Sequence, residues 1–111
     1  LPALKYAINI NGVTQLMMMK SDVLSGIDKI KVCTHYLNNN DKIDYLPFED
    51  NTNLKPVYKE LKGWEMNIMN INDLSEAPKE VHDYIKYLED ELQVPIKIIS
   101  VGPDRKQTFF R

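Results

Sequence analysis

The fold is decided by one stretch near the C-terminal end, residues 81–105, which reads VHDYIKYLEDELQVPIKIISVGPDR. Its apolar residues first recur at helical spacing, in the series Val81, Tyr84, Ile85, Leu88 and Leu92. That spacing predicts a long amphipathic helix near 76–92, with Ser75 as its N-cap. A proline then ends the helix, and the apolar run after it predicts a strand at 96–100. A helix followed by a buried strand indicates an α/β protein.

Further elements are expected upstream and downstream of this stretch. Residues 15–19 form an apolar run that predicts a buried strand, and residues 30–36 alternate with β-branched side chains on one face, which predicts another. Near the start of the chain, apolar residues at helical spacing end in Asn11-Gly12, a typical helix C-terminus. Shorter extended segments are expected at 42–45, 55–58 and 108–110. These patterns predict one α/β segment covering 1–111.

The composition narrows the class of protein. With 111 residues, 43% hydrophobic and 27% charged, the chain has the make-up of one soluble domain or part of one. The net charge of −2 disfavours a nucleic-acid surface, which needs clustered Lys and Arg. The longest uninterrupted apolar run, at 16–19, is too short to span a membrane. One cysteine, Cys33, excludes an internal disulfide and a multi-cysteine zinc site.

Two loops follow predicted buried strands, where ligands of open α/β sheets bind. The first begins with Lys20-Ser21-Asp22 and the second with Ser100-Val101-Gly102. A carboxylate can accept the N1–H and the N2 amino group of guanine together, while a lysine stem covers the purine face. A glycine lets the backbone approach a ligand closely. Taken alone, each pattern also fits an ordinary surface loop or a tight turn.

Short blocks across the whole chain resemble the adenylosuccinate synthetases in order and in spacing. The blocks are NING at 9–12, KSDVLSG at 20–26, IKVC at 30–33, PVY at 56–58, GW at 63–64, YI at 84–85, VPI at 94–96, ISVGPDR at 99–105 and QT at 107–108. In the first loop, two positions depart from the family pattern: Met19 replaces a threonine, and Ser21 replaces a leucine between the lysine and the aspartate. Neither change removes a group expected to contact the base. Thr34-His35 and the asparagine-rich turn after them are also atypical.

The resemblance implies a fold, a reaction and a binding site. Family members are P-loop-NTPase-like mixed-sheet enzymes that use GTP to ligate IMP and L-aspartate, giving adenylosuccinate, GDP and phosphate in purine biosynthesis. They require Mg²⁺ and are cytoplasmic homodimers. By position, the residues implied to hold the guanine base are Lys20, Ser21, Asp22, Ser100, Val101 and Gly102.

The same resemblance makes this chain the C-terminal portion of such an enzyme. The catalytic, metal-binding and IMP-binding residues are then expected upstream of Leu1, so no catalytic or metal-binding residue is assigned here. The chain alone is not expected to catalyse, because phosphoryl transfer needs a phosphate loop and metal ions.

A different class of function stays open: a non-catalytic α/β interaction module without useful nucleotide binding. Other residues with chemical potential have simpler structural interpretations. His35 and His82 are expected to be structural, and Met17, Met18 and Met19 are expected to fill the core. Cys33 is expected to be buried, and Trp64 is expected to pack within a turn.

Overall fold

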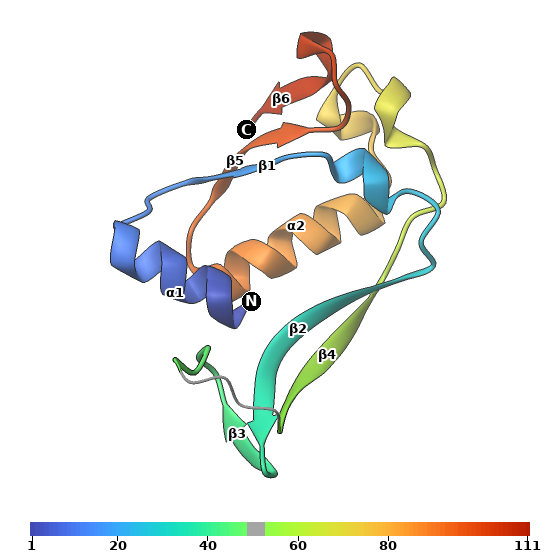
Figure 1. The fold of residues 1–111 in the computed structure, drawn as a ribbon. Helices are drawn as coiled ribbons and strands as arrows, with labels where there is room; N and C mark the ends of the chain where they lie inside the picture. Colours follow the sequence, from blue (N-terminus) through green and yellow to red (C-terminus); the bar gives the residue numbers. More distant parts are fainter. Residues whose placement is uncertain (49–52) are drawn as a thin grey trace.

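The computed structural model describes residues 1–48 and 53–111, which form a mixed α/β fold (Figure 1). The helices and strands are α1 (Pro2–Asn11), β1 (Leu16–Met18), β2 (Lys29–Asn38), β3 (Asp41–Ile43), β4 (Leu54–Lys62), α2 (Lys79–Leu92), β5 (Ile96–Ser100) and β6 (Thr108–Phe110). Short 3₁₀ turns join them: η1 (Ser21–Leu24), η2 (Ile68–Asn70), η3 (Leu74–Glu76) and η4 (Arg105–Gln107). The implied kinship of the whole enzyme to P-loop NTPases stays a prediction.

The strands form two separate three-stranded sheets. One has the order β1-β5-β6, with β1 parallel to β5 and β6 antiparallel to it. The other has the order β3-β2-β4 and is antiparallel, and it extends away from the body of the molecule (Figure 1). Because β1 and β5 run in the same direction, the loops that follow them leave from the same edge of the sheet.

Helix α2 packs against the first sheet through one apolar stripe, burying Val81, Ile85 and Leu92. It begins at Lys79 and not near 76, so Ser75 is not its N-cap. Ser75 lies instead in η3, where the Asp73 carboxylate accepts its backbone N–H at 2.8 Å. Ala77 adopts an extended conformation, as residues before proline commonly do, and this separates η3 from the helix.

The start of the chain follows its predicted pattern. Helix α1 has proline in its first turn and ends where Gly12 adopts a left-handed conformation with φ of 61°. The Gly12 N–H donates to the Ile8 carbonyl, which satisfies a carbonyl that the helix leaves free. Ile8 is buried with Leu92 and Val94, so α1 covers the C-terminal end of α2.

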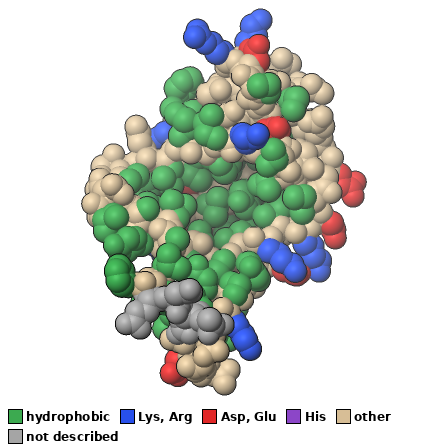
Figure 2. Space-filling model, in the orientation of Figure 1, with side chains coloured by type: hydrophobic (Ala, Val, Ile, Leu, Met, Phe, Trp, Pro, Cys, Tyr) green, Lys and Arg blue, Asp and Glu red, His purple; other side chains and the backbone are tan. Residues whose placement is uncertain are grey.

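The main core lies between α2, the first sheet and the base of β2. Its buried residues include Ile30, Val32, Trp64, Ile68, Ile71, Val81, Ile85, Ile96, Ile99 and Val101. Partly buried apolar side chains such as Leu16, Met18 and Leu88 border this core. Figure 2 shows hydrophobic side chains gathered in a hollow on the face where Figure 1 places α2 between β1 and β2.

Two further expectations, about the methionines and about Cys33, are wrong. The methionines of 17–19 do not all fill the core: Met17 and Met19 are 55% and 57% exposed, whereas Met18 packs inward. The reason is that successive side chains of a strand point to opposite faces. Cys33 is half-buried and carries a free thiol, because β2 lies in the protruding sheet.

In the described ranges, no helix is long and apolar enough to cross a bilayer.

A charged contact ties α2 to the last strands. Arg111 Nη1 donates to Glu89 Oε1 at 2.7 Å and to the Ile96 carbonyl at 2.9 Å. Glu89 Oε1 also accepts the Ile96 N–H at 2.7 Å. Burial acts to raise the pKa of Glu89, but Arg111 and the Ile96 N–H outweigh it, and the net pKa lies below its usual value. The folded state therefore favours ionised Glu89.

We expect Glu89→Gln to lower the free energy of unfolding at pH 7 by about 1 kcal/mol, because the amide still accepts the Ile96 N–H but loses its charge. The pKa of Glu89 is lowered in the folded state. The stabilisation by ionised Glu89 is therefore complete above its unfolded pKa of about 4.3, and it is lost as the pH falls through its folded pKa. Urea unfolding from pH 7 to pH 3 measures this. Glu91→Gln is the control, because its pair with Lys5 is more exposed. A difference that stays constant over this range would contradict the prediction.

Candidate functional site

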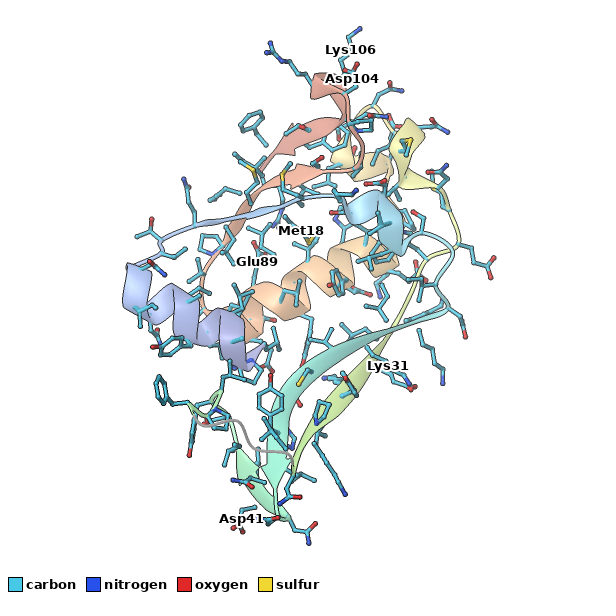
Figure 3. The ribbon with its side chains drawn as sticks, in the orientation of Figure 1. Met18, Lys31, Asp41, Glu89, Asp104 and Lys106 are labelled. Atoms are coloured by element: carbon cyan, nitrogen blue, oxygen red, sulfur yellow. The ribbon has the colours of Figure 1, made fainter. Side chains whose placement is uncertain are left out.

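A cavity of about 410 Å³ lies where the loops after β1 and β5 meet. Its lining residues are Met19, Lys20, Asp22, Ser100, Gly102, Pro103, Asp104, Arg105 and Thr108. The volume is within the usual range for small-molecule sites. The second loop projects beyond the sheet, with Asp104 and Lys106 near its tip (Figure 3). The cavity thus lies at the carboxyl edge of the parallel pair, where α/β sheets bind ligands.

The residues predicted from sequence divide into two groups. Lys20, Asp22, Ser100 and Gly102 line the cavity together. Ser21 and Val101 are almost completely buried and do not line it. The Val101 N–H already donates to the Gln107 carbonyl at 2.8 Å, so it serves the loop itself.

The first loop holds two buried oxygens that lack a hydrogen-bond partner. Lys20 adopts a left-handed conformation with φ of 56°, an unfavourable one for a lysine, and η1 begins directly after it. Within the described residues, Ser21 Oγ and Asp22 Oδ1 are buried, and neither atom has a hydrogen-bond partner. Buried polar atoms are usually paired, and unpaired ones concentrate at functional sites. Of the two residues, only Asp22 lines the cavity.

The second loop is shaped by Gln107. A Cβ at Gly102 would lie 2.2 Å from Gln107 Oε1, so a larger residue there would displace the Gln107 side chain. Gln107 Oε1 accepts the Asp104 N–H at 3.0 Å, and its Nε2 donates to the Met69 carbonyl at 2.9 Å. Asp104 in turn accepts the Lys106 N–H at 2.8 Å. This network restrains the shape of the loop.

Several residues that line the cavity were not predicted from the sequence. Met19 and Thr108 enter the cavity because β1 and β6 flank β5, and Ser100 pairs with Thr108 across the sheet. Such pairing cannot be read from a single sequence. The role of Gln107 had a local signal, because Asp104 and Gln107 stand at capping-box spacing.

A metal site does not emerge from this geometry. Among residues 1–48 and 53–111, no three His, Cys, Asp or Glu side chains come together in a way that could hold a metal ion. The Mg²⁺ that the resemblance implies is therefore assigned to no described residue. A second cavity, about 530 Å³, lies at the end of α2, where Glu89 and Arg111 form an ion pair with each other.

The chain is a mixed α/β protein with a cavity between two loops, and comparisons with known proteins specify its family. The adenylosuccinate synthetase family profile matches residues 1–109. The chain is 54% identical to adenylosuccinate synthetase of Christiangramia forsetii, over 100% of this chain and 26% of that protein. It is 56% identical to that of Flavobacterium psychrophilum, over 97% of this chain and 26% of that protein.

A solved structure agrees with these matches. The fully ligated adenylosuccinate synthetase of Plasmodium falciparum superposes with a TM-score of 0.91 and 32% identity, covering 97% of this chain and 27% of that one. The chain belongs to the adenylosuccinate synthetase family. It spans about a quarter of the length of these relatives.

We expect Ser21→Ala to raise the free energy of unfolding by about 1 kcal/mol, because it removes a buried hydroxyl that has no partner. Thermal or urea unfolding measures the change. Ser25→Ala is the matched control and should destabilise, since its hydroxyl accepts the Trp64 indole N–H at 3.2 Å. Equal effects of the two substitutions would show that Ser21 Oγ has a hydrogen-bond partner after all.

Proposed function

We propose that this chain holds the guanine base of GTP in the cavity between the Lys20–Asp22 loop and the Ser100–Gly102 loop. One observation carries the proposal: the buried Asp22 Oδ1 lacks a partner and belongs to a residue that lines the cavity. A buried carboxylate oxygen without a donor is costly, and a ligand that supplies donors relieves that cost.

Guanine matches this requirement and adenine does not. Guanine presents its N1–H and its N2 amino group on one edge, and a single carboxylate can accept both in a charge-assisted pair. Adenine offers an acceptor at N1 and no amino group at C2, so it leaves the Asp22 carboxylate unpaired. A site built around a polar group rejects an analogue that fails to pair with it.

The remaining walls suit a flat, partly apolar ring. The stem of Lys20 and the ring of Pro103 both line the cavity and offer apolar surface to a purine face. Gly102 also lines the cavity, so a ligand carbonyl can approach the main chain there. Ser21 and Val101 support the two loops from the interior, where both are buried.

The wider activity follows from family membership as part of the same proposal. The complete enzyme ligates IMP and L-aspartate with GTP, giving adenylosuccinate, GDP and phosphate in purine biosynthesis. It uses Mg²⁺ and acts in the cytoplasm as a homodimer. In this account the present residues bind and orient the base, the catalytic groups lie elsewhere in the enzyme, and this chain alone is inactive.

Titration of the isotope-labelled chain with GDP and, separately, with ADP tests the proposal by NMR. We expect amide shifts at residues 20–22 and 100–102 with GDP alone. The dissociation constant should be on the order of millimolar, since contacts to the base alone supply only a few kcal/mol. Equal shifts with both nucleotides would contradict a guanine site. No shift with either would favour an interaction module without nucleotide binding.

Asp22→Asn should weaken GDP binding at least ten-fold, because the amide NH₂ opposes the guanine N2 amino group. The same variant should gain affinity for xanthosine diphosphate, whose C2 carbonyl accepts from that NH₂. The control is Asp28→Asn, an exposed acid that does not line this cavity. Unchanged GDP affinity in Asp22→Asn would assign the base to other residues.

A further inference from the structure

Trp64 connects the hydrophobic core to the first loop. It follows β4, and only 2% of its surface is exposed. Its ring packs against Tyr84 of α2, with the ring centroids 5.9 Å apart and the planes inclined by 60°. The position of the indole is therefore set by the core and by α2, and Leu24 of η1 packs against the same core.

Three hydrogen bonds run between the segment around Trp64 and the end of the first loop. Trp64 Nε1 donates to Ser25 Oγ at 3.2 Å, and the Trp64 carbonyl accepts the Gly26 N–H at 2.8 Å. The Gly63 N–H donates to the Asp28 carbonyl at 2.7 Å. The two backbones lie so close that a Cβ at Gly63 would be 1.7 Å from the Ile27 carbonyl oxygen. Only glycine fits at position 63 without moving one of the segments.

Ser25 passes this restraint to Asp22. The Ser25 N–H donates to the Asp22 carbonyl at 3.0 Å, so the residue that carries the carboxylate is one hydrogen bond from the residue that Trp64 holds. The turn itself is weak: η1 is a single 3₁₀ turn, and its Val23 N–H reaches the Lys20 carbonyl at 3.3 Å. It also starts from the unfavourable conformation of Lys20. Such a turn needs an external anchor to keep one geometry.

We propose that Trp64 is a positioning residue for the base-binding loop, and that its indole N–H, through Ser25 Oγ, holds η1 so that the Asp22 carboxylate faces the cavity. This inference rests on the proposed guanine-binding function and assigns the control of loop geometry to a residue outside the cavity. Trp64 touches no ligand in this account. Its effect on binding passes through Ser25.

Two substitutions remove the contact from opposite ends. Trp64→Phe keeps an aromatic ring in the core but lacks the N–H, and Ser25→Ala lacks the acceptor. Each should weaken GDP binding roughly three- to ten-fold, the range expected for one hydrogen bond. The double variant should have the same GDP affinity as the single variant that binds GDP less tightly, because the two substitutions remove the same hydrogen bond. Ser25→Thr, which restores a hydroxyl, should recover the affinity.

Hydrogen exchange of the nucleotide-free chain gives a readout that does not depend on GDP. The Val23 and Ser25 amides should exchange about three- to ten-fold faster in both single variants, because the loop opens more often. Ser75→Ala is the matched control, since Ser75 lies in η3 and lines no part of this cavity; it should change neither readout.

The outcomes separate the two proposals. If the unmodified chain fails to bind GDP but the loop amides still exchange faster in the variants, the proposed function fails and the anchor stands. If the hydrogen exchange of the loop amides and the GDP affinity are both unchanged in Ser25→Ala, the positioning role of Trp64 is refuted, whatever Trp64→Phe does to stability. A double variant whose losses add would also refute it, because the two groups would then act separately.

Discussion

Parallel pairing of β1 with β5 is the constraint on which the rest of the site depends. The register sets Leu16 beside Ile96 and Met18 beside Ile99, although many residues separate these strands along the chain. Parallel strands need a long crossover, and here it contains the second sheet and α2. Because both strands end at one edge, the Lys20–Asp22 loop and the Ser100–Gly102 loop face one cavity. If β1 ran in the opposite direction, its loop would leave from the far edge.

The two loops obtain their shapes in different ways. The second is held largely by its own residues, through the contacts of Gln107 with Asp104 and its close packing on Gly102. The first has backbone hydrogen bonds of its own and, in our proposal, is also held by Trp64, a residue of the core. The side of the cavity that carries the carboxylate is also the side that is supported from a distance.

The first loop departs from the usual rules of protein interiors in a consistent direction. Among the described residues, it combines a left-handed lysine with a buried serine hydroxyl and a buried carboxylate oxygen that have no hydrogen-bond partner. Each lowers the stability of the folded chain, and such departures concentrate where a protein binds or reacts. For Asp22 the proposed guanine site gives the departure a use, since the base would supply donors to its carboxylate. For Ser21 no use follows from its surroundings, because it does not line the cavity.

The sequence by itself determined the element types, the family and the residues expected at the site. Local rules were sufficient there: the helical spacing in residues 79–92, the strand patterns in β2 and β5, and the glycine that ends α1 are all visible within a few residues. Tertiary structure decided what depends on pairing distant segments. It placed Met19 and Thr108 in the cavity and turned Ser21 and Val101 away from it. It also brought Trp64 to Ser25, since that contact depends on how β4 and α2 pack and not on any local pattern.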